Sequence, residues 1–188
     1  MKKPSHSTIQ YSYMWIILFT LLFLTDAWFF KGKLFELGAL IPHPHEYWRY
    51  FTASFLQQNL IHLLANCIGI YCIAKLAKEE MHGLTMSLVM ISANVMTYII
   101  FANVWSFTTS IGASPGIYAC LAYMLIVKKQ KKLKIDWKSS AGNYLIWFVI
   151  IPQFQGLAAC FVHGIGFIIG LLYGLMYVTI YNKKSDSQ

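Results

Sequence analysis

Three small groups of polar residues interrupt apolar stretches of the sequence, and their types are those of nucleophilic catalysis. Ser114 lies in a Gly-Ala-Ser-Pro-Gly segment at residues 112–116, and His163 lies near the start of the last apolar stretch. His62 and Asn66 are four residues apart in an earlier stretch. A serine hydroxyl becomes an effective nucleophile when a base such as histidine accepts its proton, and side-chain donors can stabilise the resulting oxyanion. The pattern indicates acyl transfer, provided that these residues meet.

The residues around Ser114 predict the start of a helix. Serine is a favoured N-cap and proline is favoured at the first helical position, which describes Ser114 followed by Pro115. Gly112 permits a tight approach to that helix. Backbone N–H groups at a helix N-terminus favour the negative charge that develops on an attacked carbonyl oxygen. Taken alone, Ser114 could equally be a cap without any chemical role.

His163 is followed by glycines at four-residue spacing, at positions 166, 170 and 174. Such a small-residue stripe lets another helix approach closely, and His163 lies on roughly the same face. If the neighbour is the helix that begins at Ser114, the imidazole can reach the hydroxyl and act as its base. A structural histidine bonded to a backbone carbonyl is the alternative.

His62 and Asn66 lie one turn apart on one face of their predicted helix. Two interpretations are compatible with this spacing. They are side-chain donors of an oxyanion hole that complement the Ser114 backbone N–H, or they are a polar pair that joins two helices inside a membrane.

The composition excludes a water-soluble globule. The chain has 188 residues, 57% of them hydrophobic and 12% charged, with a mean hydropathy of +0.53. This length leaves room for roughly six membrane spans and no separate extramembrane domain. The net charge of +8 comes from lysines beside apolar segments, where they set topology and meet anionic lipid, so we expect no nucleic-acid binding.

The apolar stretches predict an all-α, six-transmembrane-helix bundle. Expected helices cover residues 14–30, 58–77, 83–103, 114–128, 141–158 and 159–181. The first is expected to be a membrane anchor and not a signal peptide, because it has bulky aromatic residues to its end and no small-residue cleavage site. Residues 1–13 and 182–188 are expected to be tails, so residues 14–181 form one membrane domain.

The lysines predict the orientation of the bundle. In this topology three of the basic residues lie outside, namely Lys31, Lys33 and Arg49. The other twelve lie on the cytoplasmic side, namely Lys2, Lys3, Lys75, Lys78, Lys128, Lys129, Lys131, Lys132, Lys134, Lys138, Lys183 and Lys184. The positive-inside rule then places both termini in the cytoplasm, and we expect the cell membrane as the location. The three polar groups all lie near the outer ends of their helices.

The sequence gives no indication of a cofactor or a metal. The four cysteines lie inside apolar stretches without a metal-like or paired spacing, so we expect buried thiols at positions 67, 72, 120 and 160. His43 and His45 lie in an aromatic segment over residues 31–57 that we expect at the membrane interface, and we assign no metal to them.

Together these residues resemble the rhomboid family of intramembrane proteases. The family's motifs match in order at Trp48-Arg49, at His62 to Asn66 as HxxxN, at Gly112 to Pro115 as GxSx with Tyr118 four residues after the serine, and at His163-Gly164-Ile165-Gly166, with Gly170 continuing the glycine stripe. The resemblance covers residues 47–177 and implies the minimal six-helix form.

The resemblance implies an intramembrane serine endopeptidase. By this likeness Ser114 and His163 form a dyad without an aspartate, Tyr118 stacks on His163, and His62 and Asn66 line the oxyanion hole. The fifth helix and residues 152–156 would form a lateral gate and a cap over a water-filled site. Single-pass membrane proteins would be cleaved near the outer face of the membrane. The sequence does not indicate an oligomeric state.

Two segments depart from the family. Gln57-Gln58-Asn59 stands where many relatives have a further histidine, and Cys160-Phe161-Val162 stands where relatives often have a polar residue. These departures concern water delivery and substrate preference.

Three other classes of protein are alternatives. A catalytically silent rhomboid-like protein that binds membrane clients is the main alternative, against which the retention of Ser114 and His163 argues. An α/β hydrolase would need a strand before the serine and an acid between serine and histidine, where the sequence has only Asp136 in a basic loop. A channel or transporter would place polar residues along a path across the membrane, and here they cluster in its outer half.

Overall fold

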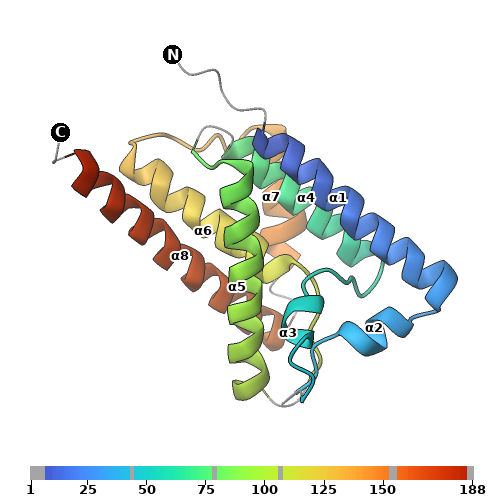
Figure 1. Cartoon of the computed structure of the whole chain (residues 1–188). Coiled ribbons are helices and arrows are strands. Elements are labelled where there is room, and N and C mark those ends of the chain that lie inside the picture. Colours follow the sequence, from blue (N-terminus) through green and yellow to red (C-terminus); the bar gives the residue numbers. More distant parts are fainter. Residues whose placement is uncertain (1–6, 43–44, 78–79, 106–107, 153–155, 186–188) are drawn as a thin grey trace.

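The fold is an all-α bundle, as the sequence predicts (Figure 1). The computed structural model describes residues 7–42, 45–77, 80–105, 108–152 and 156–185. Within them the helices are α1 (Ser7–Thr25), continued by the π-helical turn η1 (Asp26–Phe30), α2 (Lys33–Gly38), α3 (Arg49–Thr52), α4 (Leu60–Leu76), α5 (Gly83–Val104), α6 (Ser114–Gln130), α7 (Ser140–Leu145), continued by η2 (Ile146–Ile150), and α8 (Leu157–Ser185).

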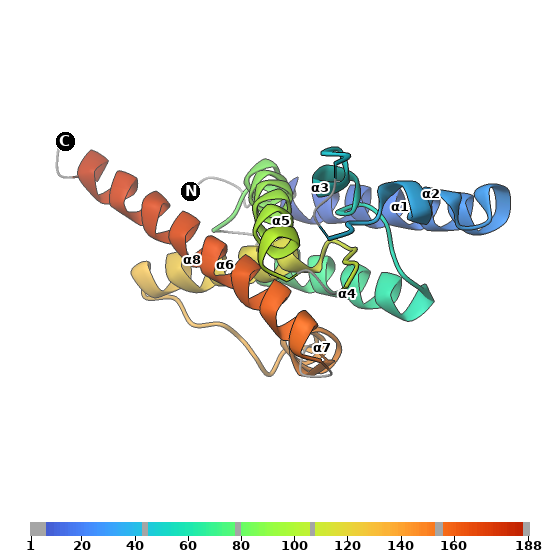
Figure 2. The same cartoon turned by 90° about the horizontal axis from the view of Figure 1, so that it is seen from below.

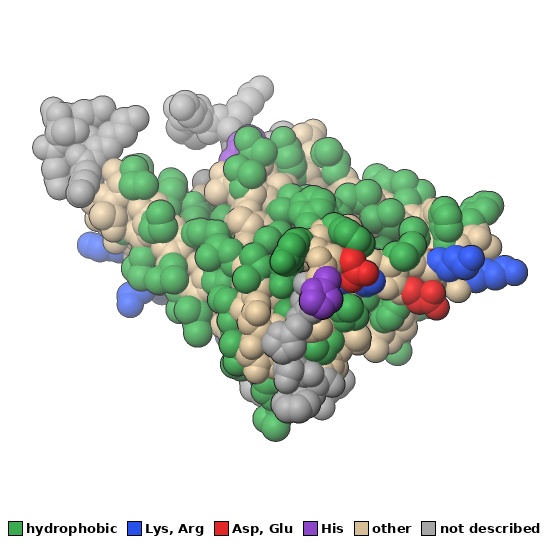
Figure 3. All heavy atoms as spheres, turned by 60° about the horizontal axis from the view of Figure 1, so that its bottom comes forward, with side chains coloured by type: hydrophobic (Ala, Val, Ile, Leu, Met, Phe, Trp, Pro, Cys, Tyr) green, Lys and Arg blue, Asp and Glu red, His purple; other side chains and the backbone are tan. Residues whose placement is uncertain are grey.

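Three helices of the described residues are long and apolar enough to cross a membrane. They cover Thr8–Phe30, Gly83–Val104 and Leu157–Asn182, with mean hydropathies of 1.7, 1.8 and 1.9. Hydrophobic side chains also cover most of the face shown in Figure 3, where charged side chains form a few small groups. A bundle with such a surface belongs in a lipid bilayer, and the chain is a multi-pass membrane protein.

The remaining predicted spans are helical but shorter. α4 and α6 have 17 residues each, and α7 with η2 is shorter still, whereas a full crossing takes about 20 residues. α6 lies inside the bundle, with twelve of its 17 residues buried, and α8 runs along it (Figures 1 and 2). Because its neighbours shield it from lipid, α6 can present its first residues inside the protein.

The first helix begins at Ser7, so the predicted start at residue 14 is wrong. The extra turns pack on the segment that leads into α5. The Thr8 hydroxyl donates to the Met81 carbonyl at 2.5 Å, and the Trp15 indole N–H donates to the Ser87 hydroxyl at 2.8 Å. The Thr8 contact, with a residue 73 positions away, stabilises helix where hydropathy alone predicts a tail. Trp15 lies within the predicted helix and binds Ser87 of α5 itself.

The predicted fifth helix over residues 141–158 is also wrong in its second half. The helix ends at Ile150, and α8 begins at Leu157 and continues to Ser185, beyond the predicted end at 181. Ile151 keeps a helical backbone conformation, with φ −64° and ψ −45°, so Pro152 acts through its missing N–H, which cannot extend the hydrogen-bonded helix. Residues 153–155 of the predicted cap lie outside the described residues.

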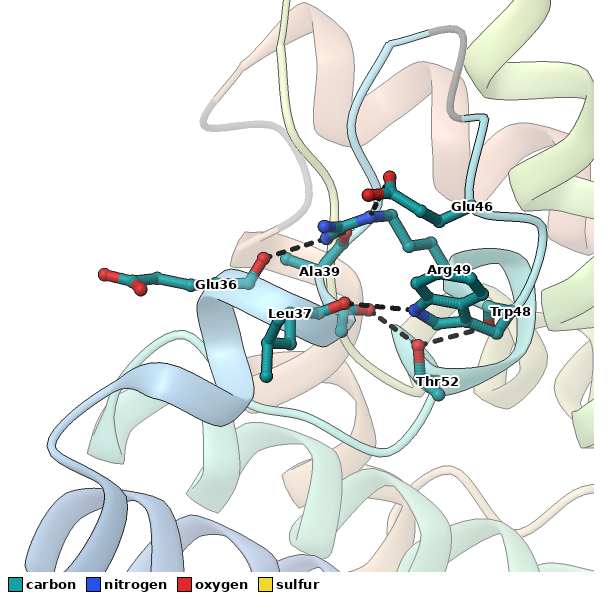
Figure 4. Close-up of polar contacts among 8 residues, drawn as sticks. Glu36, Leu37, Ala39, Glu46, Trp48, Arg49 and Thr52 are labelled. Carbon is teal, nitrogen blue, oxygen red and sulfur yellow. Dashed lines mark hydrogen bonds and ion pairs between the residues drawn. The ribbon is translucent and has the colours of Figure 1, made fainter.

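Trp48 and Arg49 fix the segment between α1 and α4 (Figure 4). The buried Arg49 guanidinium donates from Nη1 to the carbonyls of Glu36 and Ala39, each at 2.9 Å, and from Nε to the Glu46 carboxylate at 3.0 Å. The neighbouring Trp48 indole donates to a further carbonyl of α2 at 3.3 Å. The Arg49 side chain thus satisfies two backbone acceptors that would otherwise have no partner at the end of a short helix.

Candidate active site

Side chains from three helices line one cavity of about 660 Å³. α4, α6 and α8 each contribute residues from their first turns. These include the five residues expected to form the dyad, its aromatic support and the oxyanion hole, namely His62, Asn66, Ser114, Tyr118 and His163. Residues about 100 positions apart in the chain therefore meet in one place.

Ser114 and His163 are joined by a hydrogen bond. The distance between Ser114 Oγ and His163 Nε2 is 2.8 Å. With Nε2 as the acceptor, the ring carries its proton on Nδ1. The Nδ1 atom is buried and has no hydrogen-bond partner among the described residues. Within the described part of the chain this is a serine–histidine pair without a third, acidic member.

Ser114 is not the N-cap of α6, and this part of the prediction is wrong. The N-cap is Ala113, whose side chain makes no capping bond, and Ser114 is the first helical residue. The Gly116 N–H, which needs a cap, is bound instead by the Asn94 side-chain oxygen at 2.7 Å. Because buried Asn94 on α5 does the capping, the Ser114 hydroxyl is available to His163.

The glycine stripe of α8 faces α6. A Cβ built on Gly166 would overlap the Pro115 carbonyl, and one built on Gly170 would overlap the Ala119 carbonyl. The two backbones therefore lie closer than any larger residue allows. Gly164, on another face of α8, has no atom within 4 Å of such a Cβ. This close approach brings the imidazole of α8 to the hydroxyl at the start of α6.

Tyr118 holds the imidazole ring from one side. The two rings stack with centroids 4.5 Å apart and planes inclined by 20°. The Tyr118 hydroxyl donates to the Val149 carbonyl in η2 at 2.5 Å. Tyr118 is thus fixed at both ends, and its stacking restricts rotation of the His163 ring.

Gly112 places the serine segment against α4. Its φ of +113° is a conformation that residues with a side chain rarely adopt. Its N–H donates to the Ala53 carbonyl at 2.8 Å, and its carbonyl accepts from the Tyr98 hydroxyl at 2.5 Å. A Cβ at this position would lie 2.5 Å from His62 Cε1 and 3.3 Å from Asn66 Nδ2. Only glycine permits this contact between the serine segment and the α4 pair.

Both α4 side chains are oriented by the segment before that helix. The Gln58 N–H donates to His62 Nδ1 at 3.3 Å, so the proton of a neutral His62 ring is on Nε2, which can donate. The Asn66 amide nitrogen donates to the Gln57 side-chain oxygen at 2.6 Å. Two N–H donors, one from each side chain, therefore border the cavity that contains Ser114.

Metal-binding side chains do not gather in the part of the chain that the structure describes. No group of three or more His, Cys, Asp or Glu residues there could hold an ion. Of the two histidines considered for a metal, His43 lies outside the described residues.

Comparison with known proteins agrees with the motifs. Residues 44–184 match the family model of the Rhomboid domain. The chain belongs to the rhomboid family. It is 26% identical over 155 residues to RHOMBOID-like protein 1 of Arabidopsis thaliana, and 27% identical over 145 residues to Rhomboid-like protein 11, chloroplastic, of the same plant. These matches cover 76% and 74% of this chain but 39% and 47% of the two relatives, so it spans less than half of their length.

Several residues of this rhomboid site were missed by the sequence motifs. Asn94 caps α6, Tyr98 binds the Gly112 carbonyl, and Gln57, noted only as a departure from relatives, binds Asn66. Asn94 carried a signal that could have identified it, because an amide in the middle of an apolar helix needs a polar partner. For Gln57 and Tyr98 the partners lie 9 and 14 residues away, and no spacing rule predicts them.

Proposed function

We propose that this rhomboid is an intramembrane serine endopeptidase, with Ser114 as the nucleophile and His163 as the general base. One observation carries the proposal, namely the 2.8 Å hydrogen bond between the two side chains inside a cavity of the membrane bundle. A hydroxyl and an imidazole without hydrogen-bond partners are unfavourable inside a membrane, and this bond gives each of them a partner. A base must also lie within hydrogen-bonding distance of the serine hydroxyl to accept its proton.

The reaction begins when Ser114 Oγ attacks a substrate carbonyl carbon. As the Oγ–C bond forms, the hydroxyl proton passes to His163 Nε2 and the carbonyl electrons move to its oxygen. Collapse of this intermediate breaks the C–N bond, and His163 returns the proton to the leaving amine. A water molecule then hydrolyses the acyl-enzyme in the same way. No cofactor or metal is needed for these steps.

The negative oxygen would be stabilised by donors on both sides. The Ser114 N–H is at the first position of α6, where no intrahelical acceptor exists and the helix dipole is positive. His62 Nε2–H and the Asn66 amide are the side-chain donors that line the same cavity. Such preorganised donors are worth about 100-fold or more in rate each.

The expected substrates are single-pass membrane proteins, and the lipid bilayer is the medium in which they reach the enzyme. Phe148, Val149 and Pro152 form one side of the cavity, next to the lipid-exposed Trp147 and Ile151. A substrate helix would enter there and unwind locally. The lysine distribution supports an orientation with both termini in the cytoplasm, a cut near the outer face and a location in the cell membrane.

The test is cleavage of a single-pass protein in cells that express this chain. The substrate has an epitope tag on its outer domain. Wild-type enzyme is expected to release the tagged fragment outside the cell, while Ser114→Ala at equal membrane abundance releases none. Equal release by Ser114→Ala would refute the nucleophile. A fragment released into the cytoplasm would refute the orientation, and binding without cleavage by the wild type would favour a client-binding protein.

A further inference from the structure

Gln57 is a buried side chain without an assigned role. It lies in the segment between α3 and α4, and it is 6% exposed. Its side-chain oxygen accepts a 2.6 Å hydrogen bond from the amide nitrogen of Asn66, which is 3% exposed. Both groups are thus removed from bulk water, where a hydrogen bond between amides has its greatest influence on geometry.

This bond leaves Asn66 with one orientation. An asparagine amide nitrogen carries two hydrogens in a fixed plane. When Gln57 accepts one of them, the rotation of the amide about its Cβ–Cγ bond is set, and with it the direction of the second N–H. Asn66 lines the cavity of Ser114, whereas Gln57 lies behind it and does not line the cavity. Gln57 can therefore affect a substrate only indirectly, and Asn66 is the cavity residue to which it is hydrogen-bonded.

We propose that Gln57 is a positioning residue, which holds the Asn66 amide so that its second N–H is directed at the oxyanion. This inference rests on the proposed peptidase function. The same segment also fixes the nucleophile, because the Ala53 carbonyl, four residues earlier, accepts the Gly112 N–H at 2.8 Å. A Cβ on Gly112 would in turn lie 3.3 Å from Asn66 Nδ2. Residues 53–57 thus bind both the oxyanion donor, through Gln57, and the serine segment, through Ala53, and so fix their relative positions.

Gln57→Met is a suitable variant because methionine matches glutamine in length and lacks a strong acceptor. The Gln57 side-chain nitrogen is buried and has no partner among the described residues. Replacing it with an apolar group removes that unsatisfied donor, so the variant is expected to fold. Asn66 then keeps its own side chain but loses the acceptor that holds its amide in one orientation.

The experiment is a double-mutant cycle of Gln57→Met and Asn66→Ala, measured as kcat and KM on a membrane substrate. Gln57→Met alone should lower kcat about 10-fold with little change in KM, since an oxyanion donor acts in the transition state, and Asn66→Ala should lower it about 100-fold. In the Asn66→Ala background, Gln57→Met should cause no further loss. Thermal unfolding of all four proteins measures whether the two side chains also couple in stability.

Two results would overturn the inference in an active enzyme. Gln57→Met with a wild-type kcat means that Asn66 needs no support. The same fold loss in both backgrounds means that Gln57 acts through general stability or another residue. A wild-type protein that cleaves nothing is distinguishable from these results, because it overturns the peptidase proposal on which the inference rests.

Discussion

At the scale of single residues, the proposed chemistry depends on how the His163 ring is held. Its Nε2 atom meets the serine hydroxyl, while its Nδ1 atom has no partner within the described residues. In a triad an acid would orient the ring through Nδ1. Here the aromatic face of Tyr118 is the group that restricts it, and the Tyr118 hydroxyl is itself fixed to η2.

Substitutions of Tyr118 should separate the ring from its hydroxyl. Tyr118→Phe keeps the stacking and loses one hydrogen bond, so we expect a loss of about 1 kcal/mol in unfolding free energy and a kcat within about threefold of wild type. Tyr118→Leu removes the flat ring, and kcat should fall about 10-fold. Both are measured as kcat per active site with thermal unfolding.

Tyr123 is the matched control for Tyr118. It lies on the same helix, is also buried, and packs against Tyr177 away from the serine. Tyr123→Leu should reduce stability and leave kcat per active site unchanged. A comparable fall in kcat for both leucine variants would mean that stacking on His163 has no specific role.

Motifs predicted which residues gather in the cavity but not how they are fixed. Ser114, His163, His62 and Asn66 stand out because polar groups in apolar helices are rare and their spacing follows the helix period. The capping role expected of Ser114 was wrong, because Asn94, 22 residues distant from Gly116, makes that bond. Packing decides whether a helix is capped by a neighbouring residue or by one from another helix, and a single sequence does not reveal that packing.

At the scale of elements, the approach of α8 to α6 sets the distance between base and nucleophile. The backbones meet at Gly166 and Gly170, and His163 lies about one turn before Gly166 on the same helix. The glycine spacing predicted such a contact, and the Cβ positions show that α6 is the partner. A wider separation of these two helices would lengthen the hydrogen bond of the pair.

Gly166→Ala should therefore reduce stability and cleavage, whereas Gly164→Ala should not. An added methyl group at position 166 overlaps the Pro115 carbonyl, so we expect a loss of about 2 kcal/mol in unfolding free energy and a large fall in cleavage. At position 164 the methyl group meets nothing, and alanine should be neutral or stabilise α8 by about 0.5 kcal/mol. The measurement is thermal unfolding in detergent beside cleavage. Equal stability of the two variants would contradict the close packing.

Helix ends were predicted less well than helix identities. Hydropathy located every long apolar helix but placed the start of α1 seven residues late and extended the fifth helix past Pro152. The bond from Thr8 to Met81, in the segment leading into α5, supports the earlier start of α1, and this contact depends on the folded structure. Pro152 is visible in the sequence, and its missing N–H is a signal for a helix end close to this position.

At the scale of the whole molecule, the described part of the rhomboid chain is an apolar bundle with a cavity that both apolar and polar residues line. Its exposed surface is rich in large hydrophobic side chains, especially along α1 and α8. The paired serine and histidine, the stacked tyrosine and the two α4 donors all face that cavity. The proposed hydrolysis of a membrane segment requires that water reaches this cavity.

The central claim is that Ser114 is a nucleophile activated by His163, and covalent labelling in membranes tests it most directly. A fluorophosphonate probe reacts with an activated serine hydroxyl, and the modified residue is located by mass spectrometry. We expect labelling of the wild type at Ser114, none in Ser114→Ala, and at least a 100-fold slower rate in His163→Ala. Labelling that persists without Ser114, or that proceeds at the wild-type rate without His163, would contradict the account.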